Sequence, residues 1–192
     1  MITRQELINQ IEDYKPFNEQ EKMDKLLLLN WIRNNDNAFS RENTVAHMTA
    51  SAWVVNKDRS KVLMVYHNIY NSWSWLGGHA DGETDLLSVA LREVKEEAGV
   101  RASIVKYIGK SHYNFSVPED MVTKEVHWYL MTAENYHSRP QREEFFVDSG
   151  YYKFHEIYHL LRFSNEKQIV EKAYQEYLEL RSQGLWGKQR RD

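Results

Sequence analysis

Hydrophobic residues recur at helical spacing near both ends of the chain. Residues 3–13 and 19–34 are predicted to form two helices, separated at Lys15-Pro16 because proline cannot continue a helix. Residues 166–182 have the same spacing. The helices at residues 19–34 and 166–182 are each expected to bury one apolar face. The first face consists of Met23, Leu26, Leu27, Trp31 and Ile32, and the second of Ile169, Val170, Ala173, Tyr174 and Leu178.

The middle of the chain follows the shorter period of β-strands. Residues 48–56 and 61–67 are rich in β-branched and aromatic side chains, and the polar segment between them predicts a hairpin. A turn is expected at Pro118-Glu119-Asp120. Further strands are predicted at residues 103–117, 125–132 and 145–154.

One strong helical pattern interrupts these strands. It runs from about Thr84 to Ala98, and Gly99 follows it where helices often end in a left-handed residue. A loop at residues 68–75 and a turn around Gly77-Gly78 are predicted before it. This order of elements predicts an α+β (α/β) fold, a sandwich in which helices cover a mixed sheet.

Composition narrows the classes of protein. The 192 residues are 42% hydrophobic and 28% charged, which suits a single globular domain over residues 1–192. The net charge of -3 gives no basic excess, so neither a nucleic acid polymer nor a membrane is expected as a partner. The absence of cysteine excludes disulfides and a cysteine nucleophile. The charged N-terminus lacks a secretory signal, so a soluble cytoplasmic protein is expected.

The central helix carries two kinds of side chain. Glu93, Glu96 and Glu97 form an acidic stripe because they are three and four residues apart. Such a stripe is more often a solvated face, here neutralised by Arg92 and Lys95. The alternative is a site for Mg²⁺ or Mn²⁺, which prefer carboxylate oxygens. A separate apolar stripe is expected to face the core: Leu87, Ala90, Leu91, Val94 and Ala98.

The residues from Gly78 to Val100 resemble the Nudix box. That motif has a glycine, five residues, a glutamate, seven residues, and then Arg-Glu-aliphatic-x-Glu-Glu-x-Gly-aliphatic, which Arg92–Val100 matches. One position differs from the motif. Thr84 occupies the position of the first glutamate of the box, and Glu83 lies one residue before it. This departure puts the loop geometry in doubt more than metal binding. The strand order around the box is similar to the Nudix fold.

The resemblance implies roles for the box residues. Glu93 and Glu97 are implied as the principal ligands of Mg²⁺ or Mn²⁺, and Glu96 as a ligand or the base that activates water. Arg92 is implied to orient a glutamate, and Gly78 to bring its backbone to the metal site. Many Nudix enzymes take a further carboxylate from outside the box, for which the candidates are Glu119, Asp120, Glu125, Glu143 and Glu144.

The resemblance also implies an organisation of the chain. Residues 44–160 are implied to form the catalytic core. Residues 1–40 are then a helical addition before it, and residues 164–185 a C-terminal helix.

A second resemblance lies within the first. His47, His79, Glu97 and Glu125 are similar in position to the metal-binding residues of the isopentenyl-diphosphate isomerase branch of the superfamily. These histidines therefore become candidate metal ligands, although each alone is more often structural. That branch places a catalytic cysteine directly before its Gly-His pair, where this chain has Gly77. An isomerase would lack one of its two proton-transfer groups.

Three functions follow from these patterns. The first is a metal-dependent pyrophosphohydrolase that acts on a small-molecule diphosphate, such as a nucleoside diphosphate derivative. The second is an isomerase-like enzyme, and the third a Nudix-fold regulator that binds a nucleotide without turnover. The box glutamates favour an enzyme over the regulator. Tyr70 and Trp73 either pack beneath the Gly-Gly turn or stack on a flat substrate group, and the terminal helices offer a surface for a homodimer.

Overall fold

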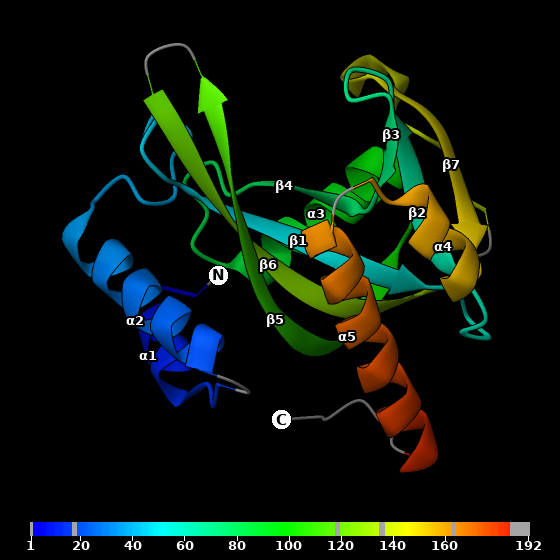
Figure 1. Ribbon diagram of the computed structural model, residues 1–192, viewed down its shortest axis with the longest axis horizontal. Coiled ribbons are helices and arrows are strands. Elements are labelled where there is room, and N and C mark those ends of the chain that lie inside the picture. The colour runs from blue at the N-terminus through cyan, green and yellow to red at the C-terminus, as the bar shows by residue number, and fades with distance from the viewer. Residues whose placement is uncertain (1, 17–18, 118–119, 135–136, 163, 185–192) are drawn as a thin grey trace.

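Helices cover both faces of one seven-stranded sheet in the computed structural model (Figure 1). Its elements follow in the order α1 (Arg4–Asp13), α2 (Glu19–Asn34), β1 (Met48–Val55), β2 (Val62–His67), β3 (Ser72–Ser74), β4 (Leu76–His79), α3 (Leu86–Ala98), β5 (Ala102–Val117), β6 (Asp120–Ala133), η1 (Arg142–Glu144), β7 (Phe146–Tyr152), α4 (Phe154–Leu160) and α5 (Ser164–Ser182). The structure describes residues 2–16, 19–117, 120–134, 137–162 and 164–184, without the side chains of 20, 110–117, 120–125, 144, 164 and 165.

The sheet is organised around β1. Along its whole length β1 pairs in parallel with β6, from Met48↔Glu125 to Val55↔Thr132. Its other edge is shared, because β4 pairs with residues 49–52 and β2 joins only at Val55↔Val62. β2 also pairs with β3 and β7, and β5 with β6, all antiparallel. The predicted mixed sheet is therefore confirmed, and β4 occupies the space that a longer β1–β2 hairpin would fill.

Alternating side chains of β1 supply two separate cores. Ala50, Ala52 and Val54 join a cluster with the buried residues of α1, α2 and α3. Trp53 and Val55 join a second cluster with α4 and α5 on the other side. Successive strand residues point to opposite faces, so one apolar strand serves both clusters. This arrangement confirms the predicted α+β sandwich, with α3 behind the sheet and α5 in front of it in Figure 1.

The ends of α3 follow the sequence signals closely. Asp85 precedes the helix and its carboxylate accepts a hydrogen bond from the Ser88 amide at 3.2 Å. Gly99 ends the helix with φ of 63°, the left-handed conformation expected for a terminating glycine. The predicted helix is confirmed, starting two residues later than expected.

The segment predicted as a loop and a Gly-Gly turn contains two strands instead. β3 lies within the predicted loop, and Gly77 and Gly78 are in β4, extended alongside Ser51 and Ala50. A Cβ atom added at Gly77 would lie 2.6 Å from the Ala50 carbonyl oxygen. Gly77 is thus needed for close approach of backbones in a sheet, not for a turn. The short helix α4 was also not predicted.

Two predicted helix faces differ from the observed ones. Within the run of four leucines in α2, Leu28 and Leu29 are buried while Leu26 and Leu27 are exposed, as is Met23. Four consecutive apolar residues cover every direction around a helix, so spacing could not select the buried face. In α5 the buried tyrosine is Tyr177, with Tyr174 and Leu178 more exposed.

Polar contacts add to the hydrophobic packing that attaches the N-terminal segment to the rest of the fold. The Thr84 hydroxyl donates a hydrogen bond to the Ile2 carbonyl at 2.5 Å, which joins the start of the chain to the loop before α3. Glu21 of α2 forms an ion pair with Lys172 of α5. These contacts agree with helices that cover the core, but the division of the chain remains a prediction. Within the described residues, no helix has the length and apolar character to span a membrane.

Candidate active site

Helix α3 places two carboxylates against β4. Glu93 and Glu97 are only 8% and 5% exposed, and the Glu97 carboxylate accepts a hydrogen bond from the Gly77 amide at 2.8 Å. The Glu93 carboxylate lies so close to Gly78 that a Cβ atom there would collide with it. The box glycine therefore makes room for the box glutamate.

The three box glutamates are not equivalent. The observed buried side of α3 contains Leu86, Val89, Ala90, Val94 and Ala98 together with Glu93 and Glu97. The separate acidic stripe expected from the sequence is therefore wrong for these two glutamates, and Leu87 and Leu91 are only half buried. The Glu96 side chain is 47% exposed. The structure thus distinguishes two enclosed carboxylates from one that meets solvent.

Arg92 links the acidic helix to the end of β4. One guanidinium nitrogen lies 2.8 Å from the Glu93 carboxylate, and the same nitrogen is 3.5 Å from that of Glu96. Its other terminal nitrogen donates to the His79 carbonyl at 3.0 Å. These contacts suit a residue that orients Glu93, as the resemblance implied, although that role stays a prediction.

The two candidate histidines contact each other. Their rings are stacked with centroids 4.8 Å apart, and His47 Nε2 is 2.9 Å from His79 Nδ1. His47 Nδ1 is 3.0 Å from the carbonyl oxygen of Asn43, a buried residue that sequence reasoning missed. A carbonyl only accepts, so Nδ1 of His47 carries the proton. With both rings neutral, His47 Nε2 accepts from His79 Nδ1, which leaves Nε2 of His79 as the acceptor nitrogen of that ring.

The predicted ligands therefore form two groups. Glu93 and Glu97 contact Gly77 and Gly78, whereas His47, just before β1, pairs with His79 at the end of β4. Residues 78 and 79 alternate between the two faces of the sheet, which accounts for the separation. Among the described residues, no three His, Asp or Glu side chains come together closely enough to enclose a metal in this arrangement.

Of the five candidates for a further carboxylate, Glu143 alone has a described side chain. Glu125 is placed by its backbone beside Met48, next to His47 in the chain, but its side chain lies outside the described residues. So do the side chains of Asp120 and Glu144, and all of Glu119. Glu143 is exposed in η1.

The loop between the box glycine and α3 accommodates the departure from the motif. The Glu83 carboxylate accepts a hydrogen bond from the Asp85 amide at 3.0 Å, so this glutamate braces the turn that leads into the helix. Thr84 instead bonds to Ile2 of the N-terminal segment. The segment that precedes α1 therefore contacts the loop at the position where the motif has a glutamate.

The aromatic residues before β4 have different environments. Trp73 packs edge-on against Tyr66 and Tyr152, so these contacts explain its presence by packing. Tyr70 is 64% exposed and contacts only His67 among the ring pairs of the described residues. Of the two residues considered for stacking on a substrate, Tyr70 is the more accessible, and Trp73 is half-buried.

A family model identifies the class of protein that this fold and site define. The chain matches the NUDIX domain over residues 45–174, and it therefore belongs to the Nudix family. The resemblance of the box is confirmed, and so, at the level of the family, is the prediction of a Nudix pyrophosphohydrolase. Nudix hydrolases generally use divalent metals.

Individual relatives are more distant. Mutator protein MutT4 of Mycobacterium tuberculosis (strain CDC 1551 / Oshkosh) is 43% identical over 60 residues, which are 31% of this chain. The match spans about a quarter, 24%, of the length of that curated relative.

Solved structures share the fold. An Ap4A hydrolase of C. elegans, in a binary complex, is 16% identical with a TM-score of 0.57, over 69% of this chain and 97% of that one. The NUDIX domain of Shewanella oneidensis NrtR, complexed with ADP ribose, is 18% identical with a TM-score of 0.56, over 77% and 97%. At this identity the likeness concerns the fold alone.

Proposed function

We propose that the protein is a metal-dependent hydrolase that cleaves a phosphoanhydride bond in a nucleoside diphosphate derivative or a related diphosphate ester. One observation carries this proposal: Glu93 and Glu97 are buried against the paired glycines of β4. Buried carboxylates need compensating positive charge, and here Arg92 supplies one cation at Glu93. A divalent metal fits this set of hard oxygen donors.

Glu93 and Glu97 would hold the metal, with Glu96 beside them. When bound, such a cation neutralises the diphosphate and lowers the pKa of a water molecule. The chain contributes the rest. The Gly77 amide holds the Glu97 carboxylate in place, and Arg92 does the same for Glu93. Glu96 is the box carboxylate that meets solvent, which suits it to accept a proton from the attacking water.

The nature of the substrate rests on the related structures. One is an Ap4A hydrolase and another contains ADP ribose, and both compounds join an adenosine to a further group through phosphoanhydride bonds. We propose a substrate of this class for the present chain.

A panel of diphosphate compounds tests the activity. Ap4A, ADP ribose and simple nucleoside diphosphates are incubated with the purified protein and Mg²⁺ or Mn²⁺, and products are separated by chromatography. Hydrolysis of at least one compound is expected, and chelation of the metal should abolish it. Binding of a panel member in the presence of metal, with no turnover of any, would instead indicate a ligand-binding protein.

The histidine pattern favours a second candidate, isomerisation of a prenyl diphosphate. Isomerisation adds a proton at one carbon and removes it at another, which requires two suitably placed groups. Gly77 stands where the isomerase branch has its cysteine, and its backbone is packed against Ser51 and Ala50. No side chain can be placed there without displacing β1. We therefore expect no conversion of isopentenyl diphosphate into dimethylallyl diphosphate. Efficient conversion with metal would establish the isomerase.

The histidine pair has its own expected roles. The proton arrangement leaves Nε2 of His79 as the nitrogen that could join a metal, with His47 as the residue that orients it. His79→Ala should then weaken Mn²⁺ binding more than His47→Ala does, as measured by metal titration. Equal affinities in the two variants and the wild type would assign both rings to structure.

A further inference from the structure

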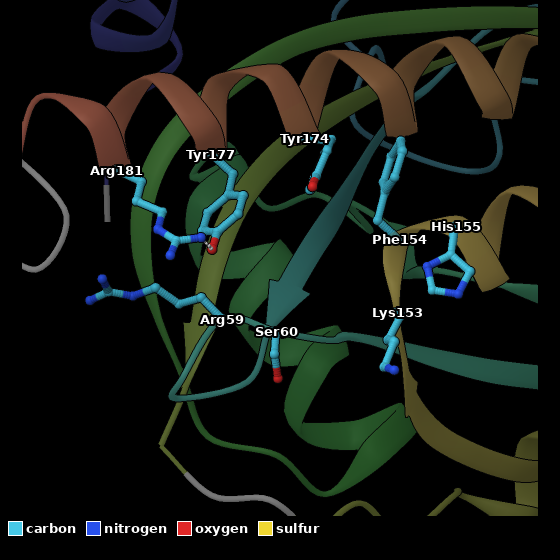
Figure 2. A pocket seen from close by; sticks show the side chains of 8 residues that line it. All are labelled: Arg59, Ser60, Lys153, Phe154, His155, Tyr174, Tyr177 and Arg181. Atoms are coloured by element: carbon cyan, nitrogen blue, oxygen red, sulfur yellow. Dashed lines mark hydrogen bonds between the residues drawn. The ribbon is translucent and has the colours of Figure 1, made fainter.

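A second concave site lies away from the box helix. A cavity of about 300 Å³ is formed where the β1–β2 turn, the junction of β7 with α4, and the C-terminal half of α5 meet. Figure 2 shows Arg59 and Arg181 on one side of it and Lys153 and His155 on the other, with Tyr177 beside Arg181 and the Arg59 guanidinium pointing away from Lys153. Its walls are Arg59, Ser60, Lys153, Phe154, His155, Tyr174, Tyr177 and Arg181.

The charge of this cavity opposes that of the protein. Arg59, Lys153 and Arg181 contribute three cations, and no Asp or Glu is among the lining residues. The whole chain has a formal net charge of -3. Because neighbouring cations repel one another, a concave basic site within an acidic protein is a favourable place for an anion.

The three cations differ in their local surroundings. Arg181 is in the last turn of α5, where a cation interacts favourably with the helix dipole. Lys153 is at the N-cap of α4, where its backbone amide donates a hydrogen bond to the Glu156 carboxylate at 2.7 Å. Arg59 adopts φ of 63°, a left-handed conformation that disfavours residues with a Cβ atom.

Aromatic rings form the wall above these cations. Tyr177 is 8% exposed, and its hydroxyl lies 3.4 Å from a guanidinium nitrogen of Arg181. Tyr174 stacks on Phe154 with ring centroids 3.9 Å apart and planes at 11°. The wall is thus preformed, since its rings are held by their neighbours. Such a wall offers an apolar surface to a planar group and hydroxyls to polar atoms.

The cavity is separate from the candidate active site. Thr49, near the start of β1, pairs with His79, whereas Arg59 follows the other end of the strand. The rise of about 3.3 Å per residue puts roughly 13 Å between Val55 and Ser51, which pairs with Gly77 beside Glu97. In addition, α3 with its carboxylates lies behind the sheet and α5 lies in front of it (Figure 1). One small ligand cannot contact both sites.

We propose that this cavity binds a phosphorylated small molecule with a planar ring, of the size of a nucleoside monophosphate. The phosphate lies between Lys153 and Arg181, and the ring packs on the tyrosines of α5. This proposal does not depend on which bond the active site cleaves. It adds a second ligand site at the opposite end of β1.

Binding is measured by calorimetry with AMP as the probe, in the presence of a chelator. Without metal, the carboxylates of the active site repel a phosphate, so binding reports on the basic cavity. The double variant Lys153→Gln/Arg181→Gln should bind AMP at least about tenfold more weakly, since each change removes a charge-assisted hydrogen bond. Both side chains belong to exposed residues, so the fold is expected to tolerate the change.

Control variants and control ligands test whether the cavity is responsible for the binding of AMP. Lys167→Gln removes a cation from the same helix, but that side chain lies over the Tyr158 ring and does not line the cavity; its AMP affinity should be unchanged. Glu97→Gln should also bind AMP normally in chelator. Adenosine should not bind detectably, and inorganic phosphate should bind more weakly than AMP. Absence of AMP binding, or equal affinity in the double variant, overturns the proposal, and equal affinity for phosphate and AMP overturns its planar-ring component.

Discussion

Replacement of Glu97 by glutamine is expected to lower turnover of the panel substrate by about a hundredfold or more, because a metal ligand contributes several kcal/mol to charge stabilisation. The fold should persist. The amide oxygen of glutamine can still accept the hydrogen bond that the Gly77 amide donates to Glu97 at 2.8 Å. Steady-state kinetics and thermal unfolding of the same preparation measure the two properties.

A matched variant guards against a general effect of removing negative charge. Glu171→Gln changes an exposed glutamate of α5 and should leave turnover and melting temperature unaltered. Wild-type turnover in Glu97→Gln would show that this carboxylate has no part in catalysis. A lower melting temperature with proportionate loss of activity would make its role structural.

Deletion of residues 1–34 is expected to destabilise the protein severely. The deletion removes α1 and α2, whose buried side chains share one hydrophobic cluster with α3, and leaves that part of the core uncovered. Exposed apolar surface of this kind leads to aggregation. Size-exclusion chromatography and thermal unfolding should show aggregation or a much lower melting temperature. A monodisperse truncation with an unchanged melting temperature would mean that the helices are an independent appendage.

Two neighbouring leucines provide a finer version of this test. Leu28 is 4% exposed and Leu27 is 59% exposed, although both belong to α2. Leu28→Ala should cost about 2–5 kcal/mol of unfolding free energy, as for other buried leucines. Leu27→Ala should change it by less than about 0.5 kcal/mol. Equal effects would show that α2 does not pack as described.

The sequence predicted most elements of the fold because local patterns determine them. The spacing in α3, the capping by Asp85 and the left-handed Gly99 are all local features. The prediction from the sequence failed where contacts with distant segments determine the local structure. Gly77 and Gly78 are extended because β1 and Glu93 approach them closely, and no local pattern distinguishes such a strand from a turn. The buried face of α2 likewise depends on its partners.

The sequence singled out candidate site residues but not their arrangement, and their roles remain predictions. The box motif singled out Glu93 and Glu97 and the glycines that they contact. The partition between carboxylates and histidines was missed, since it arises from the alternation of residues along β4. Asn43, which fixes the proton on His47, has no motif of its own. No sequence pattern indicated the basic cavity either, because its lining residues come from three distant segments of the chain.

Binding of Mn²⁺ is the most direct test of the central claim that Glu93 and Glu97 form a divalent metal site. Electron paramagnetic resonance measures free Mn²⁺ during titration of the wild type, Glu97→Gln and the Glu171→Gln control. The wild type and the control should bind Mn²⁺ with the same affinity, and Glu97→Gln should bind it at least about tenfold more weakly. Equal Mn²⁺ affinity in all three proteins would contradict the claim.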